Sequence, residues 1–208
     1  MPRRCSDALV VDMLLHEREA RLQGFQTVVG IDEVGRGPLA GPVVAAAVIL
    51  PHIPSLQDVR DSKKLSAPKR EMLYRKIHSR ALCIGMGLVE PWEIDDVNIL
   101  QATFQAMLHA VGELRVAPDF LLIDGPYRLP IDVAQKGIPQ GDQKSLSIAA
   151  ASIVAKVHRD ALMARYHTLY PLYGFDRNKG YGTPEHLEAI RRHGPCPIHR
   201  MSFKGVRH

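Results

Sequence analysis

The chain has 208 residues, of which 46% are hydrophobic and 24% are charged. This composition is typical of a soluble globular protein and disfavours a disordered chain, because enough apolar side chains are present to fill a core. Lys and Arg outnumber Asp and Glu by 27 to 22, which gives a net charge of +5. A basic protein favours polyanionic partners such as nucleic acids, although many basic proteins have other partners.

The three cysteines, Cys5, Cys83 and Cys196, are widely spaced and form no C-x-x-C pair. They indicate neither a zinc knuckle nor a disulfide framework, and they suit a reducing cytoplasm. The N-terminus has charges every few residues, unlike a signal peptide. The longest apolar stretch, residues 43–50, is far shorter than the roughly 20 residues of a membrane helix. We therefore expect a cytoplasmic protein with no membrane partner.

Helices and strands are predicted to alternate along the chain. Short β-branched runs mark the strands, apolar residues at helical spacing mark the helices, and Ser6, Ser66 and Thr183 stand at N-cap positions. The predicted elements are a helix over 7–23, strands over 27–31 and 43–50, a helix over 66–79, a strand over 82–89 that Gly85 and Gly87 break up, a helix over 95–114, a strand over 119–124, a short extended piece before Gly141, and helices over 147–166 and 184–193. This order predicts an α/β fold with a mixed sheet.

Two predicted strands end on acidic residues: Asp32 and Glu33 follow Ile31, and Asp124 follows Ile123. If the two strands are parallel neighbours, Asp32 and Asp124 point into one site, because ligands of open α/β sheets lie beyond the carboxyl ends of the strands. Clustered carboxylates repel one another unless a cation is present, and oxygen ligands select hard ions such as Mg²⁺ or Mn²⁺.

Two such ions about 3.5–4 Å apart suit in-line displacement at a phosphodiester, so the pattern favours a metal-dependent nuclease. Acids at strand ends are also common as ordinary solvated loop residues. The pattern alone leaves both interpretations open.

A glycine-rich loop follows the first acidic pair. Gly35, Gly37 and Ala40 fit the dinucleotide-binding fingerprint, but that fingerprint requires a helix to begin in the loop. Here Pro38 and Pro42 lead into a β-branched run, which predicts a strand instead. We interpret the loop as one whose glycines let backbone groups approach a substrate closely.

A series of motifs, in order along nearly the whole chain, resembles bacterial ribonuclease HII. They are GIDEVGRGPLAGPV at 30–43, DSKKLS at 61–66, LIDG at 122–125, GD at 141–142, AASIVAKVHRD at 150–160, KGY at 179–181 and HRMSF at 199–203. The resemblance implies a ribonuclease H-like fold, with a mixed central sheet flanked by helices. We expect one catalytic domain over residues 1–208 and, from the resemblance, a small helical appendage that begins near residue 170.

The resemblance also implies an activity: an endonuclease that hydrolyses the RNA strand of RNA–DNA hybrids. It implies incision 5′ of single ribonucleotides embedded in duplex DNA, which leaves 3′-hydroxyl and 5′-phosphate ends. By residue-to-residue match, Asp32, Glu33, Asp124 and Asp142 are the catalytic metal ligands and hold Mg²⁺ or Mn²⁺, with two ions when substrate is bound. We expect the enzyme to act as a monomer.

Substrate contacts carry over in the same way. The resemblance assigns contact with the 2′-hydroxyl to Gly35, Arg36 and Gly37, and packing on the following deoxyribose to Tyr181. Together these contacts select an RNA-to-DNA step, because the 2′-hydroxyl marks a ribonucleotide. The candidate contacts to backbone phosphates are Lys63, Lys64, Lys179, Ser62 and Ser147.

Two other groups of polar residues are expected to be structural. Asp160 competes with Asp142 for the fourth carboxylate position, but it lies too far along a helix for both to serve one site, and we expect it to pair with Lys156. His186, His193 and His199 lack the spacing of a zinc motif, so we expect surface or structural roles for them.

Two alternative functions would each leave a mark on the sequence. A relative restricted to long hybrids would have an altered glycine-rich loop or an altered Tyr181. A hybrid-binding protein without catalysis would have lost a carboxylate. The sequence shows neither change.

Overall fold

The computed structural model describes residues 12–52, 56 and 66–207. Its centre is a five-stranded sheet in the order β3-β2-β1-β4-β5. The strands are β1 (Val28–Val34), β2 (Val43–Ile49), β3 (Cys83–Val89), β4 (Phe120–Asp124) and β5 (Ala134–Ile138). β1, β2 and β3 pair antiparallel, whereas β4 and β5 run parallel to β1. The predicted mixed sheet is therefore confirmed, and the short extended piece is its edge strand β5.

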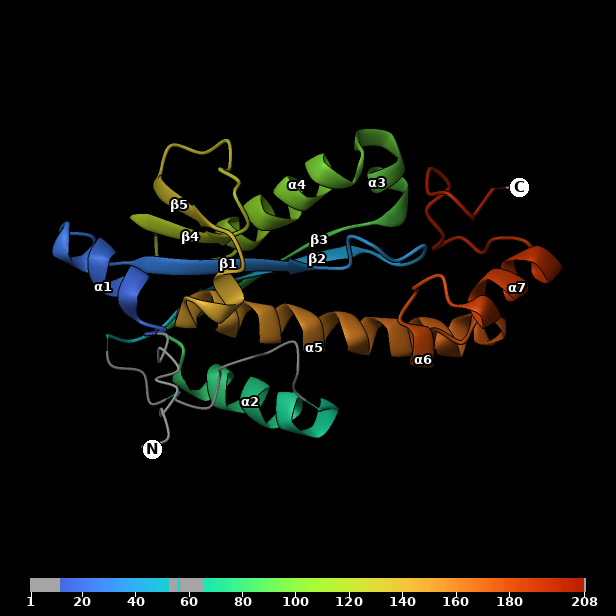
Figure 1. Cartoon of the computed structure of the whole chain (residues 1–208), viewed down its shortest axis with the longest axis horizontal. Coiled ribbons are helices and arrows are strands. Elements are labelled where there is room, and N and C mark those ends of the chain that lie inside the picture. Colours follow the sequence, from blue (N-terminus) through green and yellow to red (C-terminus); the bar gives the residue numbers. More distant parts are fainter. Residues whose placement is uncertain (1–11, 53–55, 57–65, 208) are drawn as a thin grey trace, which may run out of the picture.

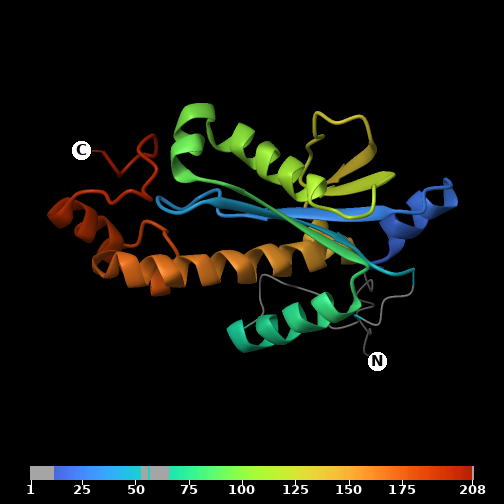
Figure 2. The same cartoon turned by 180° about the vertical axis from the view of Figure 1, so that it is seen from behind.

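Helices cover both faces of this sheet (Figures 1 and 2). They are α1 (Leu15–Leu22), α2 (Ala67–Arg80), α3 (Pro91–Val97), α4 (Ile99–Gly112), α5 (Leu146–Leu169), α6 (Phe175–Asn178) and α7 (Pro184–His193). Helix α4 lies on one face and α5 on the other, with α2 packed outside α5. No helix within the described ranges has the length and apolar character needed to cross a membrane.

The interior strand β2 is buried along its whole length because both of its faces are covered. Alternate residues of a strand point to opposite faces, so Val43, Ala45 and Ala47 join the core under α4. Val44 and Ala46 join a second core under α5 and α2. The apolar run at 43–50 was predicted as a strand of this kind.

Several element boundaries differ from the prediction. β1 runs past Asp32 and Glu33 to Val34, whereas the predicted strand ended at the acidic pair. The helix predicted over 95–114 is two helices, because Asn98 has a φ of 73° and its Oδ1 accepts hydrogen bonds from the N–H groups of Leu100 and Gln101. Because Asn is a favoured N-cap residue, Asn98 begins α4 where the chain leaves α3.

The first helix begins later than predicted, at Leu15. The Asp12 side chain accepts a hydrogen bond from the Leu14 N–H at 3.1 Å and holds a turn there. The rest of the predicted segment, with its cap Ser6, lies outside the described residues. Ser66 does stand at the N-cap of α2, but its hydroxyl makes no capping hydrogen bond.

Glycines in the sheet allow close packing of the helices. Gly85 and Gly87 do not break β3, as had been expected; a Cβ at these positions would overlap the carbonyl oxygens of Ala110 and Ala106, so the glycines let α4 lie close against the strand. Gly30 serves α5 in the same way, because a Cβ there would overlap the backbone of Ser147. The first turn of α5 therefore rests directly on β1, two residues from Asp32.

The segment after α5 folds against the loop between β1 and β2. Phe175, Ile190 and Ile198 form an apolar cluster with Leu39 and Ala40 from that loop. In Figure 1, α6 and α7 lie at the end of the molecule opposite α1. The C-terminal segment thus covers the end of the sheet at which β1 turns into β2.

Gly30→Ala is expected to lower the free energy of unfolding by about 1–3 kcal/mol, because overpacking at the contact of β1 with α5 forces the two apart. Urea denaturation measures the change. Gly112→Ala is the control, since a Cβ there meets nothing within 4 Å, and it should be neutral or slightly stabilising. Equal stability of Gly30→Ala and the wild type would contradict this packing.

Candidate active site

Parallel pairing of β1 with β4 brings acidic residues to one edge of the sheet. Ile31 lies opposite Ile123 in the register, so Asp32 and Asp124 follow side by side on the two strands. The Asp32 side chain is buried, with 2% of its surface exposed. Glu33 follows on β1. The condition on which the sequence prediction rested, that the two strands are parallel neighbours, is met.

The fourth predicted carboxylate is in the turn before α5. Asp142 lies in a short 3₁₀ helix, η3 (Gly141–Gln143), and is buried. The N–H of Gly141 donates a hydrogen bond to Asp124 Oδ1 at 2.6 Å. This bond ties the turn to the end of β4, so the structure places Asp142 next to the segment that carries Asp124.

The first three carboxylates act on one another electrostatically. Burial raises the pKa of Asp32 well above its usual value, and the negative charges of Glu33 and Asp124 raise it further. Burial likewise raises the pKa of Glu33, against the opposing effect of Arg36, whose Nη1 lies 3.5 Å from Glu33 Oε1. The ionised cluster is therefore unfavourable unless positive charge compensates it.

The residues fit a divalent cation in their chemistry. All donors are carboxylate oxygens, they are largely buried, and they repel one another, which is the environment that a hard cation neutralises. In the part of the chain that the structure describes, however, no three His, Cys, Asp or Glu side chains stand close enough together to hold an ion as arranged. The site therefore suits a divalent cation by its charge and by its oxygen donors, but its side chains are not arranged as a complete coordination shell.

A buried arginine holds the glycine-rich loop. Arg200 donates hydrogen bonds to the carbonyl oxygens of Gly35, Arg36 and Gly41, at distances from 2.6 to 3.2 Å. Burial lowers the pKa of Arg200 to about 9, which still leaves it charged at neutral pH. The planar guanidinium suits this task because it presents several donors in fixed directions.

A second buried arginine, Arg159 of α5, extends the same arrangement. It donates to the carbonyl oxygens of Ala40, Pro42 and Lys179, at 3.0–3.1 Å. It thereby joins the loop after β1 to the turn that carries Tyr181. The sequence prediction gave Arg159 and Arg200 no role, because nothing local in the sequence shows that a charged side chain is fully buried.

One predicted substrate residue, Tyr181, lines a cavity of about 250 Å³ that Glu33 also lines. It is lined by Glu33, Val34, Arg70, Ser152, Ile153, Lys156 and Tyr181. Tyr181 is half exposed, and a Cβ placed on Gly37 would lie 3.5 Å from its ring. Lys179 is partly buried in the same turn. The structure therefore places Tyr181 and Glu33 at one cavity, with Gly37 of the glycine-rich loop next to the Tyr181 ring.

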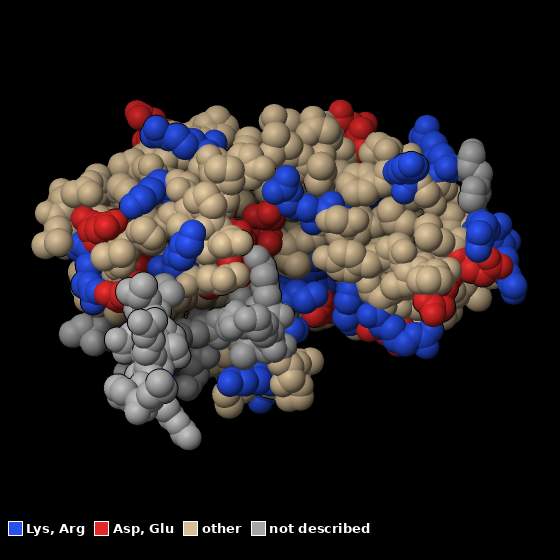
Figure 3. All heavy atoms as spheres, viewed as in Figure 1, with Lys and Arg blue, Asp and Glu red and all other residues tan. Residues whose placement is uncertain are grey.

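Positive charge flanks this place. The surface in Figure 3 has Asp and Glu atoms near its centre, with Lys and Arg atoms on both sides. Lys156 and Arg70, which the sequence prediction left without a substrate role, line the cavity and contact Asp160 at 2.7 and 3.7 Å. The predicted Lys156–Asp160 pair is present, so Asp160 is held in a structural contact.

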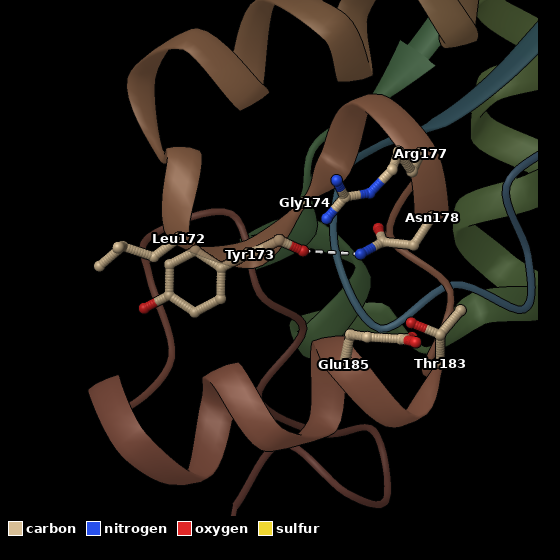
Figure 4. Close-up of a pocket in the computed structure, with 7 residues that line it drawn as sticks. All are labelled: Leu172, Tyr173, Gly174, Arg177, Asn178, Thr183 and Glu185. Atoms are coloured by element: carbon tan, nitrogen blue, oxygen red, sulfur yellow. Dashed lines mark hydrogen bonds between the residues drawn. The ribbon is translucent and has the colours of Figure 1, made fainter.

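A larger cavity, of about 360 Å³, lies in the C-terminal segment between α6 and α7 (Figure 4). Its lining includes Leu172, Arg177 and Glu185 and none of the carboxylates discussed above. Cavity size therefore does not locate the chemistry here. Charge and the convergence of polar groups do.

One predicted substrate contact must be corrected. Ser147 is buried, and its hydroxyl donates a hydrogen bond to Glu17 Oε1 at 2.7 Å, so it supports the first turn of α5 instead of facing a substrate. Ser62, Lys63 and Lys64 lie outside the described residues. His186 and His199 are buried, as a structural role requires, whereas His193 is exposed.

Comparison with known proteins shows the family of the chain. A sequence profile described as ribonuclease HII matches residues 29–206. The chain belongs to the ribonuclease HII family. It is 67% identical over 207 residues to ribonuclease HII of Syntrophobacter fumaroxidans, covering all of this chain and 89% of the relative. It is 52% identical over 196 residues to ribonuclease HII of Bacillus subtilis, covering 94% and 76%.

Solved structures show the same fold. Ribonuclease H2 of Pyrococcus horikoshii superimposes with a TM-score of 0.77 at 28% identity, covering 88% of this chain and 96% of the other. A ribonuclease HII of Archaeoglobus fulgidus, solved in complex with PCNA, gives 0.74 at 28% identity, covering 86% and 96%. The predicted ribonuclease H-like fold is confirmed. As a member of the ribonuclease HII family, the chain is a nuclease that hydrolyses the RNA strand of RNA–DNA hybrids.

Asp32→Asn is expected to stabilise the protein at neutral pH when divalent ions are absent, because it removes a buried charge. The raised pKa of Asp32 sets the direction. A protonated Asp32 favours folding at low pH, and this contribution is lost as the pH rises through the raised pKa. The advantage of the variant should therefore shrink as the pH falls toward 4. Thermal melts in a chelator across this range measure it.

Asp160→Asn is the matched control, since that carboxylate is ion-paired with Lys156 and Arg70. It should not stabilise the protein at any pH. An Asp32→Asn variant that melts below the wild type at neutral pH would contradict the electrostatic description of the site.

Proposed function

We propose that this member of the ribonuclease HII family also incises duplex DNA 5′ of a single embedded ribonucleotide, by two-metal-ion catalysis, leaving 3′-hydroxyl and 5′-phosphate ends. The observation that carries the proposal is that Tyr181 and Glu33 line one cavity and that Gly37 of the glycine-rich loop lies against the Tyr181 ring. A site that reads both sugars of an RNA-to-DNA step needs a contact for the 2′-hydroxyl and a surface for the sugar that lacks it.

The metal ligands in this proposal are Asp32, Glu33, Asp124 and Asp142. Mg²⁺ or Mn²⁺ would supply an activated water and stabilisation of the leaving oxygen. A solved ribonuclease HIII that shares the fold, at 19% identity and a TM-score of 0.67, was crystallised with Mn²⁺. The buried setting of Asp32 and Asp142 excludes water from around the carboxylates, which strengthens their attraction for a cation.

Recognition of the ribonucleotide falls to Gly35, Arg36 and Gly37 in this proposal. Because Arg200 donates hydrogen bonds to the carbonyl oxygens of Gly35 and Arg36, that part of the loop is held in one conformation. Arg36 also directs its guanidinium toward Glu33, which couples recognition to the carboxylate cluster. Tyr181 packs on the deoxyribose that follows.

Lysines would bind the backbone phosphates that flank this step. Lys63, Lys64 and Lys179 are the proposed contacts, and Lys156 and Arg70 add positive charge at the cavity itself. We further propose that the enzyme works as a cytoplasmic monomer with one catalytic domain.

A labelled DNA duplex with one ribonucleotide, incubated with Mg²⁺ or Mn²⁺, tests the proposal. The expected result is a single cut 5′ of the ribonucleotide that a chelator abolishes and that an all-DNA duplex does not show. Cleavage of a long hybrid without this cut would restrict the enzyme to long hybrids. Binding of both substrates without cleavage of either would indicate a hybrid-binding protein without catalytic activity.

Tyr181→Ala is expected to lower the ratio of single-ribonucleotide cleavage to long-hybrid cleavage by about tenfold, which corresponds to about 1.4 kcal/mol of selective contact. Initial rates on the two substrates give the ratio. Trp92→Ala is the control, since Trp92 is an exposed aromatic residue that does not line the cavity. An unchanged ratio in Tyr181→Ala would remove Tyr181 from junction recognition.

A further inference from the structure

Two buried histidines lie directly beneath the turn that carries Tyr181. His186 is on α7 and His199 is in the loop that follows, and their Nε2 atoms are 3.0 Å apart. Nδ1 of His186 lies 2.8 Å from the carbonyl oxygen of Tyr181. Nδ1 of His199 lies 2.9 Å from the N–H of Cys196. The two rings therefore form a continuous chain of hydrogen bonds from the backbone of Cys196 to the backbone of Tyr181.

The direction of donation along this chain follows from its two ends. The amide of Cys196 is a donor, so Nδ1 of His199 accepts, and a neutral His199 carries its proton on Nε2. The Cys196 carbonyl also lies near Nδ1, but at the longer distance of 3.2 Å. Nε2 of His199 then donates to Nε2 of His186, which leaves the proton of His186 on Nδ1. That proton is donated to the Tyr181 carbonyl, which can only accept.

The surroundings keep both rings neutral. His186 and His199 are buried, and the aromatic rings of Tyr173 and Phe175 pack around them with centroid distances of 4.9–6.3 Å. Burial, together with the neighbouring His186, lowers the pKa of His199 to about 4. Because all four ring nitrogens have a polar neighbour, the pair is arranged as a hydrogen-bonded support and not as a metal site.

The turn above the histidines needs such support. Lys179 and Gly180 both have left-handed φ angles, of 52° and 87°, just before Tyr181. A non-glycine residue is uncommon in that region, so other contacts must hold the turn. Asn178 does so from one side, with its side chain bonded to the Tyr173 carbonyl (Figure 4) and to the Gly180 N–H. His186 holds the other side through the Tyr181 carbonyl.

We propose that the His186–His199 pair is a positioning device that fixes the backbone of Tyr181 and thereby sets the selectivity of the enzyme for the RNA-to-DNA step. This inference rests on the proposed role of Tyr181. Neither histidine touches the substrate, and both act through the orientation of the Tyr181 ring. The device links the C-terminal loop, where His199 lies beside Arg200, to the substrate cavity.

Two variants at position 186 test the hydrogen-bond donor to the Tyr181 carbonyl separately from the rest of the side chain. His186→Leu removes the hydrogen bond to the Tyr181 carbonyl, whereas His186→Asn keeps an N–H donor near the position of Nδ1. The quantity measured is the ratio of single-ribonucleotide cleavage to long-hybrid cleavage. We expect His186→Leu to lower this ratio by roughly 3-fold to 10-fold, as the loss of one hydrogen bond predicts, and His186→Asn to restore most of it.

Tyr173→Phe is the matched structural control. It removes the hydrogen bond from the Tyr173 hydroxyl to the Gly194 carbonyl within the same cluster, without touching the Tyr181 turn. It should leave the ratio unchanged. In the double variant Tyr181→Ala/His186→Leu, the ratio should equal that of Tyr181→Ala alone, because both changes act through one side chain.

Several outcomes would overturn the inference. They are a folded His186→Leu with the wild-type ratio, a Tyr173→Phe that lowers the ratio as much as His186→Leu does, and a double variant that falls well below Tyr181→Ala. If Tyr181→Ala alone keeps the wild-type ratio, the proposed role of Tyr181 fails first. If Tyr181→Ala lowers the ratio and His186→Leu does not, only the positioning role fails.

A measurement on the wild type covers the case in which His186→Leu does not fold. Nitrogen-15 NMR of the histidine rings distinguishes the two neutral tautomers. At about pH 8, above the pKa of an ordinary histidine, we expect the neutral His186 ring to carry its proton on Nδ1 and the neutral His199 ring to carry its proton on Nε2. A proton on Nε2 of His186 would overturn the inference, because the bond to Tyr181 would then have no donor.

Discussion

The parallel pairing of β1 with β4 places the carboxylates of Asp32 and Asp124 side by side where little water reaches them. The surrounding residues reduce the electrostatic cost of this arrangement. Burial and mutual repulsion raise the pKa values of Asp32 and Glu33. A protein does not retain such an arrangement for stability, since buried like charges destabilise the folded state. The surroundings reduce the penalty through hydrogen bonds, such as the one from Gly141 to Asp124. The remaining negative charge gives the site its attraction for cations.

The second constraint is that the loop after β1 has no regular structure of its own. Its carbonyl groups are instead satisfied by Arg159 from α5 and Arg200 from the C-terminal loop. Residues that are distant in the sequence therefore fix the backbone beside the carboxylates. Arg159 also holds the carbonyl of Lys179, so the glycine-rich loop and the Tyr181 turn are held by the same side chain. Substitutions in the C-terminal segment should therefore change the conformation of the backbone at the substrate cavity.

Sequence reasoning predicted the features that depend on local pattern. The strand at 43–50, the strand ending at Asp124 and the capped helix at 184–193 are all present. Apolar runs and capping residues act within a few positions, so they can be recognised in one sequence. The neighbourhood of Asp32 and Asp124 required one further condition, parallel pairing, which the sequence left open and the register shows to be met.

The features that the sequence did not predict depend on tertiary contacts. The break at Asn98 lies inside a continuous apolar pattern, and only the positive φ of that residue reveals it. Serine is a residue type that often binds phosphate, but the hydroxyl of Ser147 donates to Glu17, which comes from a helix at the other end of the chain. Arg159, Arg200 and the two histidines are polar residues in a core, and a single sequence does not tell these from surface residues. The roles of individual site residues and the domain organisation stay predictions.

Binding of Mn²⁺ to the wild type and to Asp124→Asn is the most direct test of the central claim, that the carboxylates at the ends of β1 and β4 form a cation site. The titration is followed by the electron paramagnetic resonance signal of free Mn²⁺. Asparagine keeps the oxygen that accepts the hydrogen bond from Gly141, so the fold should be retained and only a charged ligand is lost. The account predicts that the variant binds Mn²⁺ at least about tenfold more weakly and loses cleavage. Equal binding by the two proteins would contradict it.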